Sequence, residues 1–321
     1  MKQVTLRQVA AAAGVSLSAA SRVINQKPRI SDAVRKRVLD TAKRMNYDLT
    51  NTICGKKQVA ILFTKEWNFV ETFYTSCLLS HLYTLLSEKG YLVHILNQEN
   101  LLNNRSFRAV ICIDSVNMYT LEWGLKHSVP MISINSEEKP PENVYSIRSN
   151  ESQGIELAVN SLWQAGHRKI GLFIVGNRRT WCNQARIRGF LRAMRNRGIP
   201  DPVIEYDEND YSRSVGKLVS AGVSAIIVPA EGSGHKVANI LQQEYKLRIP
   251  EDISLVVWEV PGVTEYFTPG LSSVCQNFAV IAEEVETLLK NFNLSESKPF
   301  YSLVDYQFFP RKSIAPQNIP E

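Results

Sequence analysis

Residues 4–47 constrain the fold most, because their caps and apolar spacing define three short helices. Thr5, with a glutamine three residues later, forms a capping-box pattern, and Ser16 and Ser31 are N-cap candidates for the second and third helices. Gly14 ends the first helix, since glycine adopts positive φ at little cost. A helix, a tight glycine-containing turn and a second helix are typical of a helix-turn-helix, whose second helix lies in the DNA major groove.

The second helix of this stretch has two distinct faces. Ala20, Val23 and Ile24 recur at helical spacing and predict its buried side. The remaining side chains are left outside, where DNA could be contacted: Leu17, Ser18, Ser21, Arg22 and Asn25.

Positive charge is concentrated at the N-terminus. The chain of 321 residues has a net charge of +6, and residues 1–57 hold twelve of its 37 Lys and Arg against three Asp. The remainder is therefore mildly acidic. A basic head on such a body suits a polyanionic partner at one end of the molecule.

The amino-acid sequence of the head is more specific than its helical pattern. Thr-Leu-x-x-Val-Ala-x-x-Ala-Gly-Val-Ser, which starts at Thr5, is followed by Ser-Arg-Val-Ile-Asn from Ser21. This combination resembles the headpiece of the lac-repressor (LacI/GalR) family of bacterial regulators. The resemblance implies a homodimer that binds double-stranded DNA at a palindromic operator and responds to a small effector.

Beyond the head, short apolar runs alternate with helix-sized segments. Strands are predicted at 59–63, 91–96, 109–113, 129–134, 144–147, 169–175, 203–206, 225–228, 253–258 and 301–309. Helices are predicted at 73–86, 152–165, 184–196, 213–220, 237–245 and 279–292. This alternation indicates βαβ units and parallel sheets in two α/β halves, with a ligand cleft between them.

The body resembles the same family in several motifs. They are Gly-His-Arg-Lys-Ile at 166–170, Arg-x-x-Gly-Phe at 186–190, Ile-Pro-Glu-Asp-Ile-Ser at 249–254 and Thr-Pro-x-Leu-Ser-Ser-Val-x-Gln at 268–276. The resemblance implies an α/β fold with a helix-turn-helix headpiece and a periplasmic-binding-protein-like core of two parallel-sheet subdomains. We expect the headpiece at 1–47, a hinge at 48–58 and the core at 59–321. Within the core, we expect an N-subdomain at 59–148 and 277–300 and a C-subdomain at 149–276 and 301–321.

The resemblance also implies the residues of each site. The effector, expected to be a sugar or sugar derivative, would contact residues that line the cleft: Phe73, Ser149, Arg186, Tyr211, Glu231, Glu259 and Gln276. Arg186 offers a fork of donors, and Glu259 can accept two hydroxyl hydrogen bonds. Three positions depart from the family and leave the ligand open: Ser149-Asn150 replaces Asp-Asn, Glu231-Gly232 replaces Asn-Asp, and Val257-Trp258-Glu259 replaces Gly-Phe-Asp.

In the head, residue chemistry separates two kinds of DNA contact. Arg22 fits the O6 and N7 atoms of guanine, Leu17 could pack on a thymine methyl, and Ser18 adds a permissive hydrogen bond. Phosphate contacts are expected from Ser16, Ser21, Asn25, Ser31 and the basic side chains. The predicted DNA-binding set also includes Thr5, Arg29, Tyr47 and Ile53.

The hinge departs from the family pattern of a Pro-Asn pair and a short helix that inserts a leucine into the minor groove. No proline follows Tyr47, and the segment is shorter by about three residues, nearly one helical turn. Thr50, Asn51, Thr52 and Ile53 are mediocre helix formers. We therefore expect a short or absent hinge helix, with Ile53 or Leu49 as the wedge candidate and a smaller operator bend.

Other classes of protein receive little support from the sequence. Dinucleotide and P-loop fingerprints are missing, and the five histidines have no metal-ligand spacing, so we expect no enzyme, metal or cofactor. Five cysteines without a Cys-x-x-Cys pattern, no signal peptide and no membrane-length apolar run lead us to expect a cytoplasmic protein with no membrane partner. Two alternatives stay open: an effector-independent regulator with a degenerate cleft, and a two-domain α/β enzyme with a basic head.

Overall fold

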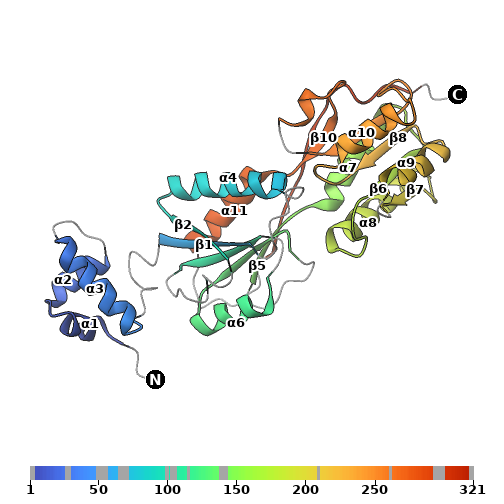
Figure 1. Cartoon of the computed structure of the whole chain (residues 1–321). Coiled ribbons are helices and arrows are strands. Elements are labelled where there is room, and N and C mark those ends of the chain that lie inside the picture. Colours follow the sequence, from blue (N-terminus) through green and yellow to red (C-terminus); the bar gives the residue numbers. More distant parts are fainter. Residues whose placement is uncertain are drawn as a thin grey trace.

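The chain forms three parts in the computed structural model, a small helical unit followed by two α/β units (Figure 1). The structure describes residues 4–25, 30–47, 57–63, 72–97, 101, 107–113, 116–136, 144–207, 210–259, 262–291 and 301–317. Arg29, Ile53 and the expected hinge up to residue 56 lie outside these ranges.

The helical unit consists of α1 (Leu6–Ala12), α2 (Leu17–Ile24) and α3 (Asp32–Arg44). The capping box at Thr5 is present, and Gly14 has a φ of 64°, in the left-handed region that glycine reaches without strain. The three helices meet in one small core: Val9, Ala10, Ala13, Ala20, Val23, Ile24, Val38 and Ala42. The predicted helix-turn-helix is therefore present as a unit with its own core.

The first α/β unit, which we call the N-subdomain, contains a six-stranded parallel sheet in the order β11-β5-β4-β3-β1-β2. Its strands are β1 (Gln58–Phe63), β2 (Leu92–Leu96), β3 (Ala109–Ile113), β4 (Met131–Ile134), β5 (Val144–Ser149) and β11 (Tyr301–Val304). Helices α4 (Thr72–Glu88) and α11 (Phe278–Asn291) cover one face of this sheet, and α6 (Met118–His127) covers the other (Figure 1).

The second α/β unit, the C-subdomain, contains a six-stranded sheet in the order β12-β10-β9-β8-β6-β7. Its strands are β6 (Ile170–Ile174), β7 (Val203–Tyr206), β8 (Ala225–Val228), β9 (Ser254–Trp258), β10 (Ser272–Cys275) and β12 (Gln307–Phe309). Only β12 is antiparallel to its neighbour among these described strands. Helices α7 (Glu151–Gln164) and α8 (Trp181–Arg195) pack on one face, and α9 (Tyr211–Ser220) and α10 (Gly234–Gln243) pack on the other. The short helix η3 (Thr264–Tyr266) precedes β10.

Three connections cross between the subdomains: β5 to α7, β10 to α11, and β11 to β12. The last crossing corrects our expected boundary, because residues 301–304 do not belong to the C-subdomain. Tyr301–Val304 pairs with β5 in the N-subdomain sheet, and only after Asp305 and Tyr306 does the chain join the other sheet. Ser149 likewise ends a strand of the N-subdomain sheet, so the expected C-subdomain start at 149 is one residue early.

Candidate functional site

The exposed face of α2 carries the predicted base-reading side chains. Leu17 is 43% exposed although it is apolar, and Ser18 and Arg22 are exposed beside it. The opposite face supplies Ala20 and Val23 to the core of the head. The helix is thus anchored by one face and offers the other to a partner.

Several predicted phosphate ligands also hold the head together. The Ser16 Oγ accepts the N–H of Ala19 at 3.1 Å and so caps α2. The Asn25 side-chain amide donates to the Ser21 carbonyl at 2.9 Å, so its donor is engaged within α2. Ser31 is the N-cap of α3, but its exposed hydroxyl makes no capping bond and remains open to an external group.

Thr5 and Tyr47 have structural roles at the two ends of the head. Thr5 exchanges hydrogen bonds with Gln8, and Tyr47 is half-buried against the head's core. Basic side chains line the outward part of α3: Arg35, Lys36, Arg37, Lys43 and Arg44. Together with Arg22 they give this small unit the positive charge that a phosphate backbone attracts.

A chain of hydrogen bonds joins the two subdomains through Gln276, directly after β10. The Gln276 Oε1 accepts from the Asn135 amide at 2.7 Å and from the Ser149 hydroxyl at 2.6 Å. Its Nε2 donates to Glu231 Oε1 at 2.8 Å. Asn135 in turn donates to the Tyr74 hydroxyl at 2.9 Å. Three predicted cleft residues, Ser149, Glu231 and Gln276, are therefore brought together.

Arg186 lies near the same group of buried side chains, since Glu231 acts on its pKa, but it is already paired. Its Nε and Nη2 atoms donate to the Glu151 carboxylate at 2.7 and 3.3 Å, and its Nη1 donates to Asn183 Oδ1 at 3.2 Å. The Tyr306 hydroxyl donates to Glu151 at 2.9 Å. Burial alone would lower the pKa of Arg186, but the adjacent Glu151 carboxylate holds it well above its usual value. The expected fork toward a ligand is therefore directed mainly at Glu151.

Glu259, at the end of β9, is the most constrained acid of the cleft. It is 2% exposed, and its Oε1 has no hydrogen-bond partner among the described residues. Burial raises its pKa to about 7, with a further contribution from Glu231, while the backbone N–H groups of Gly232 and Gly234 act in the opposite direction. Burial therefore favours a proton on this carboxylate, or a hydrogen-bond donor from a ligand at its Oε1.

The two predicted aromatic contacts differ in their placement. The Tyr211 hydroxyl lies 3.1 Å from the Ser233 Oγ, which puts it beside the turn that carries Glu231. Phe73 is 48% exposed near the start of α4, and it is its neighbour Tyr74 that bonds to the cleft chain.

Sequence reasoning missed several residues of the cleft: Tyr74, Asn135, Glu151, Ser233 and Tyr306. One signal could have found Glu151. It directly precedes the helix predicted at 152–165 and follows a predicted parallel strand by a few residues, at the carboxyl end of the strand where ligand sites of α/β sheets gather.

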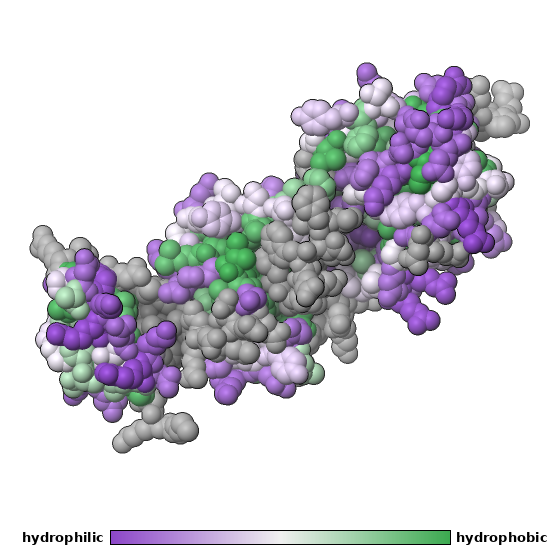
Figure 2. Space-filling view, viewed as in Figure 1, coloured by the Kyte–Doolittle hydropathy of each residue, from purple (hydrophilic) through white to green (hydrophobic). Residues whose placement is uncertain are grey.

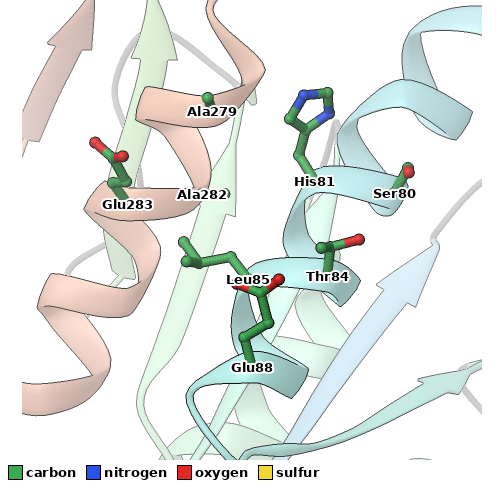
Figure 3. Close-up of a pocket in the computed structure, with 8 residues that line it drawn as sticks. All are labelled: Ser80, His81, Thr84, Leu85, Glu88, Ala279, Ala282 and Glu283. Atoms are coloured by element: carbon green, nitrogen blue, oxygen red, sulfur yellow. The ribbon is translucent and has the colours of Figure 1, made fainter.

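A separate groove of about 320 Å³ lies between α4 and α11, and its lining includes none of the predicted cleft residues (Figure 3). His81 and Leu85 from α4 face Ala279 and Ala282 from α11, with Glu88 and Glu283 at its sides. The His81 ring lies 5.8 Å from the Phe278 ring and its Nδ1 is 2.8 Å from the Cys77 carbonyl, so its position has a structural explanation.

Within the described part of the chain, no cluster of three or more His, Cys, Asp or Glu side chains could hold a metal ion. Nor is any helix in these ranges long and apolar enough to cross a membrane.

Comparison with known families matches two segments of the chain. Residues 5–48 match the family described as "Bacterial regulatory proteins, lacI family". Residues 159–314 match the family described as "Periplasmic binding protein-like domain".

Relatives of known function match nearly the whole length. The HTH-type transcriptional repressor PurR of Aliivibrio salmonicida is 25% identical over 297 residues, covering 85% of this chain and 87% of the relative. The ribose operon repressor of Haemophilus influenzae is 26% identical over 306 residues, covering 89% and 91%.

Solved structures share the fold. A transcriptional regulator CelR–cellobiose complex superimposes with a TM-score of 0.67 at 22% identity, covering 97% of this chain and all of the other. A LacI family regulator from Enterococcus faecium with bound ribose has a TM-score of 0.68 at 20% identity, covering 82% and 100%. With its exposed α2 face and two-sheet core, the chain carries a DNA-binding domain of the lacI family of bacterial regulatory proteins at residues 5–48 and a periplasmic-binding-protein-like domain at residues 159–314.

Proposed function

We propose that this protein is a repressor that binds a palindromic operator as a homodimer, and that a small polar effector in the cleft controls its affinity for DNA. The observation that carries this proposal is the polar chain through Gln276, which bonds residues of both subdomains within one cleft. A ligand inserted there must rearrange bonds that fix the two subdomains relative to each other. Selection of operator sequences, followed by titration of metabolites against the protein–DNA complex, tests the proposal.

The DNA contacts of the proposal divide along the surface of the head. Leu17, Ser18 and Arg22 read bases, because they share the one face of α2 that the core does not use. The exposed Ser31 hydroxyl and the basic side chains of α3 bind phosphates. Thr5, Ser16, Ser21, Asn25, Arg29, Tyr47 and Ile53 complete the proposed DNA-binding set.

Arg22→Ala is expected to weaken operator binding by about 1–3 kcal/mol and to relax the preference at one base pair of each half-site. The reason is that an exposed guanidinium on the free face of α2 can bind guanine through two bonds. Binding to a library of operator variants measures both effects. Ser21→Ala, as the comparison, should weaken all sequences evenly. An unchanged sequence preference in Arg22→Ala would contradict the base-reading role.

Control by the effector requires that ligand and DNA prefer different arrangements of the subdomains. A ligand shifts such an equilibrium only through its difference in affinity for the two states. In this proposal the three crossings act as the hinge between the subdomains, and the hydrogen bonds of Gln276 hold one of their two arrangements. Ser149, Glu231, Glu259, Arg186, Tyr211, Phe73 and Gln276 form the proposed effector site.

Carbohydrate is the proposed effector class. Cellobiose and ribose are bound in the two similar structures, and the cleft here presents acceptors and donors suited to hydroxyl groups. An effector-independent regulator is the second candidate, because Arg186 and Gln276 already have partners within the protein. The unpartnered buried Oε1 of Glu259 favours the effector-binding protein. A rise in melting temperature with any sugar would decide between them.

A hydrophobic surface on the N-subdomain supports the homodimer. Tyr83 on α4 and Leu92 and Ile95 on β2 are 53%, 47% and 52% exposed. Strand β2 is the outer strand of its sheet, and Figure 2 shows hydrophobic surface gathered over β2 beside α4. Contiguous apolar surface at a sheet edge marks interaction sites in soluble proteins. A second copy can cover it through a two-fold axis.

Ile95→Asp is expected to convert the dimer to a monomer at micromolar concentration, because a carboxylate would be buried without a partner in the interface. Operator affinity should then fall by about 100-fold or more, since the two half-sites are no longer bound by one particle. Sedimentation equilibrium measures the first effect and a gel-shift titration the second. Tyr119→Asp is the matched control, because Tyr119 on α6 is 68% exposed and lies outside this surface. A dimer that persists in Ile95→Asp would refute the assignment of this face.

A further inference from the structure

The charges of the cleft are unbalanced once its ion pair is formed. Glu151 and Arg186 neutralise each other through two hydrogen bonds. Glu231 and Glu259 are left, and neither forms a salt bridge with any described residue. Among the described residues, the two carboxylates therefore have no ion-pair partner, although Glu231 also acts electrostatically on Arg186.

Nearby basic side chains are engaged elsewhere. The Lys236 ammonium lies 5.4 Å from the centre of the Tyr211 ring. Arg311 donates to Glu265 at 2.8 Å. Neither side chain forms a salt bridge with Glu231 or Glu259 in the described part of the chain.

The two carboxylates converge from different elements. Glu231 lies in the turn after β8. Gly232 of that turn and Gly234, the first residue of α10, direct their backbone N–H groups at the Glu259 carboxylate. Gln276 occupies one oxygen of Glu231. The Oε1 of Glu259, which is almost fully buried, is left without a donor among the described residues.

A buried carboxylate oxygen without a donor is costly, and a second carboxylate beside it increases that cost. A hydroxyl group of a ligand would supply one hydrogen bond but no positive charge to balance the two acids when both are ionised. An ammonium group supplies three donors and a positive charge. A carboxylate or phosphate on the ligand would be repelled.

Resting on the effector-binding role proposed above, we propose that the ligand of this cleft carries a protonated amine, as an amino sugar does, and that Glu231 and Glu259 bind this amine together. The ligand class is thus a polyhydroxylated amine, distinguished from a neutral sugar and from a sugar acid. The hydroxyl groups of such a ligand would form hydrogen bonds with Ser149, Gln276 and Tyr211.

Matched compounds that differ only in this group test the proposal. The first set is D-glucosamine, D-glucose and D-glucuronate; the second is D-galactosamine, D-galactose and D-galacturonate; the third is ethanolamine, ethylene glycol and glycolate. Calorimetric titration of the full-length protein without DNA gives each dissociation constant. We expect the amine of at least one set to bind about ten-fold or more tightly than its neutral counterpart, the size of a hydrogen-bonded charge interaction.

Two isosteric variants connect the preference to the site. Glu231→Gln and Glu259→Gln should each reduce the preference for the amine to about three-fold or less, since each removes one of the two carboxylates that would bind the ammonium group. Glu251→Gln, an exposed acid of the same subdomain, should leave it unchanged. Neutral members that bind as tightly as the amines, a preference that persists in both variants, or no binding by any amine up to 10 mM (about the weakest affinity that such a titration detects) would each overturn the proposal.

The outcome is separable from the regulatory function. An operator complex that responds to a neutral sugar alone would contradict the amine and preserve the regulator. Binding of the amine by a protein that selects no operator sequence would support the amine ligand and contradict the regulatory function.

Discussion

Arg186→Ala is expected to lower the free energy of unfolding of the core by about 3–5 kcal/mol. The arginine is 8% exposed and its partner Glu151 is 5% exposed, so the substitution leaves a buried carboxylate without its cation. The Tyr306 hydroxyl would still donate to Glu151, but one neutral donor does not compensate a charge. Urea denaturation at pH 7, followed by fluorescence, measures the change.

Two further variants separate a buried pair from charge loss in general. Arg248→Ala breaks the ion pair with Asp252. Because the Arg248 side chain is 70% exposed, this variant should lower the stability much less. Adding Glu151→Gln to Arg186→Ala should recover part of the lost stability, because the stranded charge is gone. Equal effects of Arg186→Ala and Arg248→Ala would show that the Glu151 pair contributes little.

Arg186 has a structural role that an effector experiment must separate from ligand binding. The sequence predicts that Arg186 presents its donor fork to the ligand, so that Arg186→Ala would remove a ligand contact. Because Glu151 takes two of those donors, the variant weakens the fold of the cleft as well. A lost response therefore assigns a ligand contact only if it is measured under conditions where the variant is fully folded.

Local signals explain why the head could be predicted in detail. The Thr5 capping box, the φ of Gly14 and the buried face of α2 depend on residues within a few positions of one another. In the core, apolar runs such as β3 were recognised for the same reason, since a buried parallel strand is apolar on both faces.

Elements with mixed composition were missed. Strand β10 begins with Ser272 and Ser273, which are buried because Arg311 and Ser313 supply their hydrogen bonds from far along the chain. Helix α6 leaves Met118 and Tyr119 exposed, which obscures its apolar periodicity. In both cases the partners that make the element possible are distant in sequence.

The pairings of the cleft could not be derived from spacing either. Gln276 and Asn135 are 141 positions apart, and Arg186 and Glu151 are 35 apart. Resemblance to the family indicated Gln276 and Arg186, but their partners depend on which strand ends meet across the crossings. The division of residues 301–309 between two sheets could not be predicted for the same reason. The sequence of this segment does not indicate at which residue the chain leaves one sheet and joins the other.

Glu259→Gln is expected to stabilise the protein above neutral pH by about 3 kcal/mol, the free energy that corresponds to a pKa shift from 4.5 to about 7. The folded protein holds a proton on Glu259 over this interval, whereas the unfolded chain has already released it. The stability associated with this proton is therefore fully present below pH 4.5 and is lost as the pH rises through about 7. Glutamine cannot ionise, so the variant should lack this loss.

The difference between the two proteins is the quantity to measure, because other groups titrate in the same range. Burial and Lys236 lower the pKa of His235, whose effect on stability has the opposite dependence on pH, and Glu231 is the acid that acts on Glu259 directly. Urea denaturation from pH 4 to 8 should give nearly equal stabilities at the acid end and a gap that widens through neutrality. Glu251→Gln, on the exposed turn before β9, should follow the wild type throughout. A constant gap at all pH values would mean that the benefit of glutamine comes from packing, and that Glu259 is not protonated in the folded protein near neutral pH.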